Sequence, residues 1–127
     1  MSKDFDAVFS NLRAILTRHA DTLTVSEDVP NRYCLDAPIG PATLKAWGGT
    51  AKRKTIPVAW TEIGKAYVSF HLMGLEAASG AISPALKARL QGKTCFNFSK
   101  PDAALFEELE AVTAHSIAAL RRAGYCA

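Results

Sequence analysis

The stretch Gly-Lys-Ala-Tyr-Val-Ser-Phe-His-Leu-Met, residues 64–73, decides the fold that we expect for this chain. Apolar and polar side chains alternate along it, which is the pattern of a strand with one face against a core. One face carries Ala66, Val68, Phe70 and Leu72, and the other carries Lys65, Tyr67, Ser69 and His71. The second face combines a phenol, a hydroxyl and an imidazole, so we expect a functional site on that side.

The segments around this strand predict an antiparallel sheet. Lys54–Ile63 precedes it and is joined to it by a tight turn at Gly64, so the two segments should form a hairpin. Pro57 cannot donate a ladder hydrogen bond, which requires a sheet edge or a bulge there, and alternation places Ile56, Val58 and Trp60 on one face. Other expected strands are Asn31–Ala37 and Lys93–Phe98, with Thr43–Trp47 as a short candidate and Asp21–Pro30 as either a strand or an extended arm.

Helices are expected at both ends of the chain. Lys3–Ala20 repeats apolar residues at the spacing of one helical face, and a final helix should run from the Ser99–Asp102 segment to about Arg122. A shorter helix is expected between Ser83, as its cap, and Gly92. We therefore predict one α+β domain, residues 1–127, with an antiparallel sheet of four to five strands and the N- and C-terminal helices packed on one face.

The net charge, the cysteines and the apolar segments of the sequence argue against several classes of protein. The 127 residues carry a formal net charge of only +3, which argues against a nucleic-acid partner. The cysteines Cys34, Cys95 and Cys126 are far apart and odd in number, so we expect reduced thiols rather than a disulfide framework. The sequence shows no apolar signal region and no membrane-spanning run, and we therefore expect a cytoplasmic protein without a membrane partner.

Several motifs together resemble a known family. They are Gly64-Lys65 in the hairpin, Gly92-Lys93-Thr94 followed by Phe96 and Phe98, and Lys100-Pro101 before the last helix. Over roughly residues 40–120 the chain resembles the YdhG-like family, the domain of unknown function 1801. The resemblance implies an α+β domain with an antiparallel sheet, and it carries no settled reaction. Some members have been likened to frataxin-type iron chaperones, which the resemblance implies as a minor alternative. The chain departs from the acidic ridge that such a role needs, because the first helix carries Arg13 and Arg18 as well as Asp4 and Asp6.

The outward faces of the predicted strands suggest a binding surface. One strand presents Tyr67, Ser69 and His71, another presents Lys93, Cys95 and Asn97, and a third presents Arg32, Cys34 and Asp36. Our main hypothesis is a domain that binds a small molecule or a protein partner on the helix-free face of the sheet. The expected ligand-binding residues are Tyr67, His71, Cys95, Asn97 and Trp60, with Arg32 as an anion contact and Trp47 as a second apolar wall.

Two alternatives use the same surface. Cys95 and His71 form a thiolate nucleophile if they lie within hydrogen-bond reach, which would make the protein an enzyme. A homodimer through the open sheet face is the structural alternative. The sequence identifies no cofactor. It predicts no metal site, because His19, His71 and His115 lie on separate elements. Gly92-Lys93-Thr94 follows a helix and precedes a strand, the reverse of a phosphate-binding loop.

Overall fold

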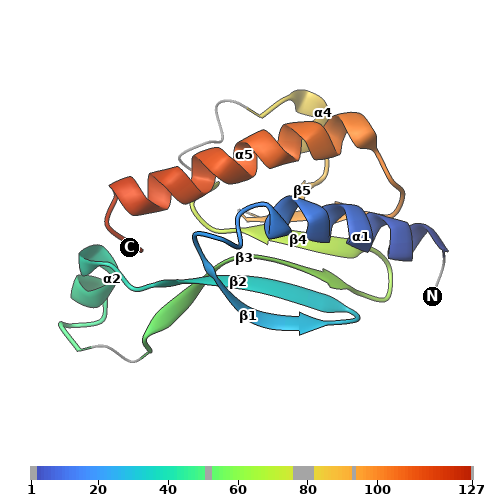
Figure 1. Ribbon diagram of the computed structural model, residues 1–127. Helices are drawn as coiled ribbons and strands as arrows, with labels where there is room; N and C mark the ends of the chain where they lie inside the picture. Colours follow the sequence, from blue (N-terminus) through green and yellow to red (C-terminus); the bar gives the residue numbers. More distant parts are fainter. Residues whose placement is uncertain (1–2, 51–52, 76–81, 93, 127) are drawn as a thin grey trace.

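A computed structural model describes residues 3–50, 53–75, 82–92 and 94–126. In the described residues, six strands form one antiparallel sheet in the order β1-β2-β3-β4-β6-β5. Figure 1 shows the long helices α1 and α5 on the same side of this sheet. The elements in chain order are α1 Lys3–Thr17, β1 Thr24–Val29, β2 Arg32–Pro38, α2 Pro41–Ala46, β3 Thr55–Ile63, β4 Val68–Leu72, α4 Pro84–Lys87, β5 Leu90–Gln91, β6 Cys95–Phe98 and α5 Ala103–Arg122. The predicted α+β architecture is confirmed.

The core lies between the sheet and the two long helices. Helix α1 buries Val8, Leu12 and Leu16, and α5 buries a stripe that includes Leu109. These side chains pack on the inner face of the sheet, where Phe70 and other apolar residues are fully buried. The Phe98 and Phe106 rings meet edge to face, with their centroids 5.0 Å apart and their planes inclined by 79°. The two long helices thus cover one face of the sheet, and in the described parts of the chain no helix lies on the other face (Figure 1).

Strand β3 is central and bulged, as the proline within it requires. Leu35 of β2 faces Ala59, and the next residue, Asp36, faces Pro57, so β3 contains one residue more than its partner. The bulge lets Pro57 lie inside a sheet without a backbone donor. It also breaks the alternation that we expected, because Ile56 and Trp60 end on opposite faces. The prediction that Ile56, Val58 and Trp60 share one face was therefore wrong.

Three other boundaries differ from the sequence-based expectation. The sheet has six strands rather than four to five, because Leu90–Gln91 pairs with β6 instead of ending a helix. The segment predicted as a short strand at Thr43–Trp47 is mostly helix α2, which begins with Pro41 at its first position. Strand β4, expected over residues 64–73, begins at Val68, because residues 64–67 form the hairpin loop. Lys93, which we placed at the start of a strand, lies outside the described residues.

Helix boundaries follow their capping residues. The Ser83 hydroxyl accepts a hydrogen bond from the Leu86 N–H, as a cap should, and Pro84 occupies the first turn. The Asp102 carboxylate caps α5 by accepting from the Leu105 N–H at 3.2 Å. Among the helices in the described parts of the chain, none combines the length and apolar character needed to cross a membrane.

Candidate functional site

The sheet register brings five of the six predicted ligand-binding residues onto the helix-free face. One cross-strand row runs through Cys34, Trp60, His71 and Cys95, and a neighbouring row runs through Arg32, Glu62, Ser69 and Asn97. Both rows alternate with core-facing residues of the same strands, so they share the face opposite the helices. The sixth residue, Tyr67, lies in the hairpin loop before β4 and is 38% exposed.

Cys95 and His71 are neighbours, but the shifts in their pKa values keep Cys95 in the protonated thiol form at neutral pH. The Cys95 Sγ lies 3.8 Å from the His71 Nε2 and donates a hydrogen bond to the Asn97 Oδ1 at 3.3 Å. Burial raises the pKa of the Cys95 thiol, and the Glu62 carboxylate raises it further. Burial also lowers the pKa of His71, against the opposing effect of Glu62. Both groups are therefore neutral at pH 7, whereas a reactive cysteine needs a lowered thiol pKa.

The imidazole of His71 has a packing partner on its other side. Its ring is stacked on the indole of Trp60, with centroids 4.7 Å apart and planes inclined by 12°. Stacked aromatic pairs in this range contribute roughly 0.5–1.5 kcal/mol beyond their buried area. His71 thus holds the Trp60 side chain in place on the helix-free face.

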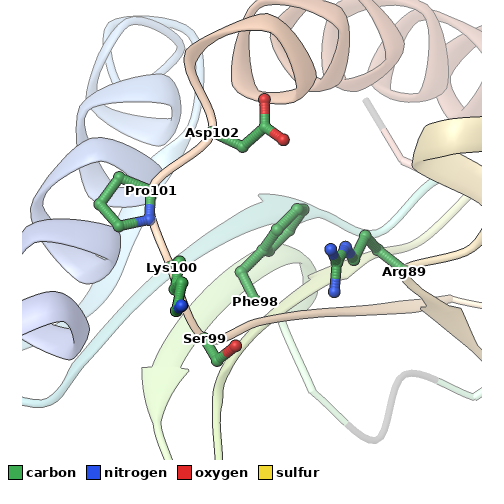
Figure 2. A pocket seen from close by; sticks show the side chains of 6 residues that line it. All are labelled: Arg89, Phe98, Ser99, Lys100, Pro101 and Asp102. Atoms are coloured by element: carbon green, nitrogen blue, oxygen red, sulfur yellow. The ribbon is translucent and has the colours of Figure 1, made fainter.

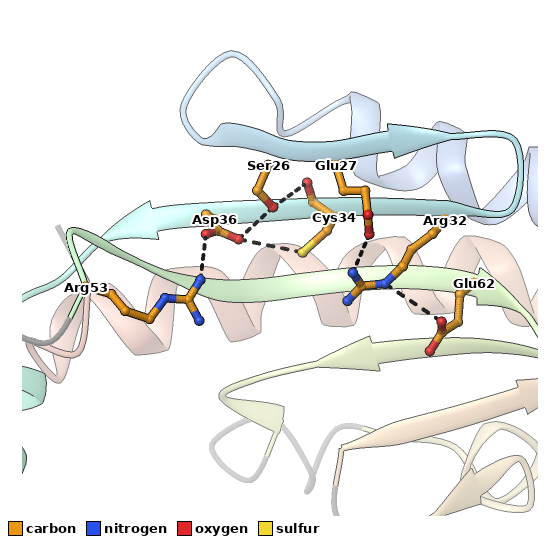
Figure 3. A network of polar contacts seen from close by, with 7 residues as sticks. All are labelled: Ser26, Glu27, Arg32, Cys34, Asp36, Arg53 and Glu62. Atoms are coloured by element: carbon orange, nitrogen blue, oxygen red, sulfur yellow. Dashed lines mark hydrogen bonds and ion pairs between the residues drawn. The ribbon is translucent and has the colours of Figure 1, made fainter.

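Arg32 lies between two carboxylates, as Figure 3 shows. Its guanidinium forms an ion pair with Glu27 of β1, and its Nε lies 3.7 Å from the Glu62 Oε2 of β3. We expected Arg32 to contact an anionic ligand. An anion there would have to displace or approach these two carboxylates, so the position disfavours that role.

Asp36 is the centre of a second polar network on the same face (Figure 3). Its carboxylate is almost fully buried and accepts hydrogen bonds from the Ser26 hydroxyl at 2.9 Å and the Thr55 hydroxyl at 2.8 Å. The Cys34 Sγ lies 3.6 Å from one carboxylate oxygen and Arg53 Nη2 lies 3.6 Å from the other. Burial raises the pKa of the Cys34 thiol, so Cys34 also stays protonated at neutral pH.

An apolar groove of about 370 Å³ adjoins these rows at the end of the sheet where β3 begins and β4 ends. Its aromatic lining consists of Trp47, Trp60 and Tyr125. Its other apolar lining residues are Ile56, Pro57, Met73 and Leu120, and its polar ones are Thr43 and Arg53. The two tryptophans are the walls that the sequence suggested. Met73 and Tyr125 are large side chains that remain 39% and 47% exposed.

The C-terminal segment is held against α2, and this contact positions Tyr125 in the groove. The Gly40 and Ala42 N–H groups donate to the Tyr125 and Gly124 carbonyl oxygens at 3.0 and 2.8 Å. The Thr43 hydroxyl donates to the Tyr125 carbonyl oxygen at 2.5 Å. A Cβ on Gly40 would lie 2.2 Å from the Gly124 carbonyl oxygen, so only glycine permits this approach.

A second cavity, of about 260 Å³, lies at the start of α5 (Figure 2). Arg89 and Lys100 line it together with Phe98, Ser99, Pro101 and Asp102. The Asp102 carboxylate already caps the helix and faces the same cavity, so an anion bound there would meet a negative charge. This cavity is therefore a weaker candidate than the apolar groove.

Residues from distant parts of the chain complete the groove, and sequence reasoning missed them. Met73, Leu120, Tyr125 and Arg53 come from four different segments and share no motif. No group of three or more His, Cys, Asp or Glu residues among those that the structure describes could hold a metal ion. Comparisons with family models, curated proteins and solved structures found no match to this chain.

Proposed function

We propose that this protein is a binding domain for a small, planar, apolar molecule, and that the ligand enters the groove beside Trp47, Trp60 and Tyr125. The observation that carries the proposal is the convergence of three aromatic side chains around a space of about 370 Å³. Ligand pockets in proteins commonly enclose roughly 300–1,000 Å³ and are lined mainly by apolar and aromatic groups with a few polar ones. A flat ring system is the occupant that such a lining binds best.

The size of the groove favours a small molecule over a protein. A stable protein interface buries about 800 Å² on each partner and involves roughly 20–30 residues a side. Nine residues line the groove. The helix-free face beside it carries the ion pairs of Arg32 with Glu27 and Glu62, and a homodimer there would have to bury charged groups.

The Cys95–His71 pair supports the groove better than it supports catalysis. The distance of 3.8 Å is compatible with a hydrogen bond to sulfur, but both groups are neutral at pH 7. His71 also stacks on Trp60, which lines the groove. We therefore assign to His71 the role of supporting the Trp60 wall. Membership of the YdhG-like family stays a prediction that rests on the sequence motifs, and the iron-chaperone role stays a minor alternative that the resemblance implies.

Two tyrosines provide a matched test by isothermal titration calorimetry with naphthalene carboxamide, an uncharged planar probe. Tyr125 lines the groove, and Tyr67 is a similarly exposed tyrosine in the hairpin loop. We expect Tyr125→Ala to weaken binding about three- to tenfold through lost aromatic contact, and Tyr67→Ala to leave the affinity unchanged. Equal effects of the two changes, or no binding by the unaltered protein, would refute the groove as the site.

A further inference from the structure

Among the residues that the structure describes, the contact of the Arg53 guanidinium in the groove is an ion pair with Asp36. The other polar lining residue, Thr43, donates its hydroxyl to the Tyr125 carbonyl oxygen. The Arg53 Nη2 lies 3.6 Å from the Asp36 Oδ2, which is an ion-pair distance but too long for a good hydrogen bond. The Arg53 side chain is 57% exposed, so its planar guanidinium can reach a molecule in the groove.

Asp36 does not depend on Arg53 for its hydrogen bonds. Each of its carboxylate oxygens accepts from a hydroxyl, one from Ser26 and the other from Thr55. Among the residues that the structure describes, Asp36 is the carboxylate within ion-pair distance of Arg53. If Arg53 turned from Asp36 toward a ligand, the buried carboxylate would keep both hydroxyl donors. The exchange therefore leaves no buried acceptor without a hydrogen-bond donor, while the negative charge of Asp36 stays near the bound anion and reduces the gain in affinity.

We infer that the ligand of the groove carries a carboxylate, and that Arg53 recognises it with its guanidinium. This inference rests on the proposed function, because the ring system of the ligand must occupy the space beside Trp47 and Trp60. A guanidinium offers two parallel N–H donors that match the two oxygens of a carboxylate. The ligand class is thus a planar aromatic acid, with its ring against the tryptophans and its acid group at the Arg53 end.

The test compares naphthalene carboxylate with naphthalene carboxamide, two probes of nearly the same shape that differ in charge. We expect the protein to bind the carboxylate roughly three- to tenfold more tightly, a modest ratio because solvent screens a half-exposed arginine. Arg53→Gln should bring the ratio of the two dissociation constants close to one, because it removes the charge that distinguishes the two probes. Lys45→Gln removes an exposed charge of α2 outside the groove lining and should keep the ratio.

The outcomes separate the two proposals. If the carboxamide binds but the carboxylate binds no more tightly, or if Arg53→Gln keeps the ratio, the role of Arg53 is refuted and the groove remains a binding site. If neither probe binds, the groove itself is refuted. Arg53→Lys adds a test of geometry, because an ammonium keeps the charge but lacks the two parallel donors, and it should recover only part of the preference.

Discussion

The close approach of the C-terminal segment to α2 makes Gly40→Ala the sharpest perturbation of the groove. The new Cβ would lie 2.2 Å from the Gly124 carbonyl oxygen. Because the Cβ is fixed rigidly to one backbone segment and the carbonyl oxygen belongs to the other, the two segments must separate by about 1 Å before the contact becomes tolerable. Such a shift would lengthen the Gly40–Tyr125 and Ala42–Gly124 hydrogen bonds, now 3.0 and 2.8 Å, beyond useful range.

The expected cost follows from those contacts. Two lost hydrogen bonds at about 0.5–1.5 kcal/mol each lower the free energy of unfolding by about 1–3 kcal/mol. For a chain of 127 residues this corresponds to a fall in Tm of roughly 3–15 °C. The same shift moves Tyr125, so binding of naphthalene carboxamide should weaken as well.

Gly64→Ala is the matched control, measured by thermal unfolding followed by circular dichroism. A Cβ on Gly64 would lie 3.1 Å from the Tyr67 carbonyl oxygen, which needs an adjustment of only a few tenths of an ångström. We expect its Tm to change much less than that of Gly40→Ala. If both variants melt at the same temperature, or if Gly40→Ala melts like the unaltered protein, the contact does not hold the C-terminal segment as described.

Three further predictions concern the helix-free face. Burial raises the pKa of Cys95 and lowers the pKa of His71, so the alkylation of Cys95 by iodoacetamide should be slow at pH 7 and faster toward alkaline pH. The rate, measured by site-resolved mass spectrometry, should be the same in His71→Ala. A fast reaction that depends on His71 would favour the enzyme alternative. A lowered His71 pKa means that the unfolded chain binds this proton more readily, so the stabilisation is present above about pH 6.5 and is lost as the pH falls through the folded-state pKa. Urea unfolding between about pH 7 and pH 5 should therefore show a steeper loss of stability in the unaltered protein than in His71→Gln, and parallel curves would contradict the assignment. Asp36→Asn replaces one acceptor oxygen with an N–H donor, so that one hydroxyl must reverse its hydrogen bond, and it removes the charge that faces Arg53. We expect a cost of about 1–3 kcal/mol, whereas Asp28→Asn, at an exposed ion pair with Arg13, should cost less than about 1 kcal/mol. Equal urea midpoints of the two variants would contradict the Asp36 network.

Local patterns predicted the architecture and much of the helix-free face. Alternation in β4 and β6 placed His71, Cys95 and Asn97 on one face, because successive side chains of a strand lie on opposite faces whichever strands are its neighbours. Pro57 predicted either a sheet edge or a bulge for a similarly local reason, and the structure has the bulge. We did not predict that Trp60 and Ile56 lie on opposite faces of the sheet. One extra residue in β3 reverses the alternation of its side chains, and the sequence does not show at which position that residue is inserted.

Local sequence patterns could not predict the groove. Trp47 and Trp60 were recognised as candidate walls, but Tyr125 reaches them only because Gly40 allows the chain end to approach α2. The role of Arg53 depends on how Ser26 and Thr55 satisfy Asp36 across three strands. Contacts of this kind depend on strand order and on the path of the chain end. Residue spacing does not encode either of them.

The most direct measurement is a titration of the ¹⁵N-labelled protein with naphthalene carboxamide, followed by NMR. The chain contains two tryptophans, and both line the groove, so their two indole N–H signals report on it directly. We predict that both signals shift with the same dissociation constant, while the backbone signals of Ser99 and Asp102 at the second cavity do not move. Unchanged indole signals, or shifts confined to the second cavity, would contradict the account.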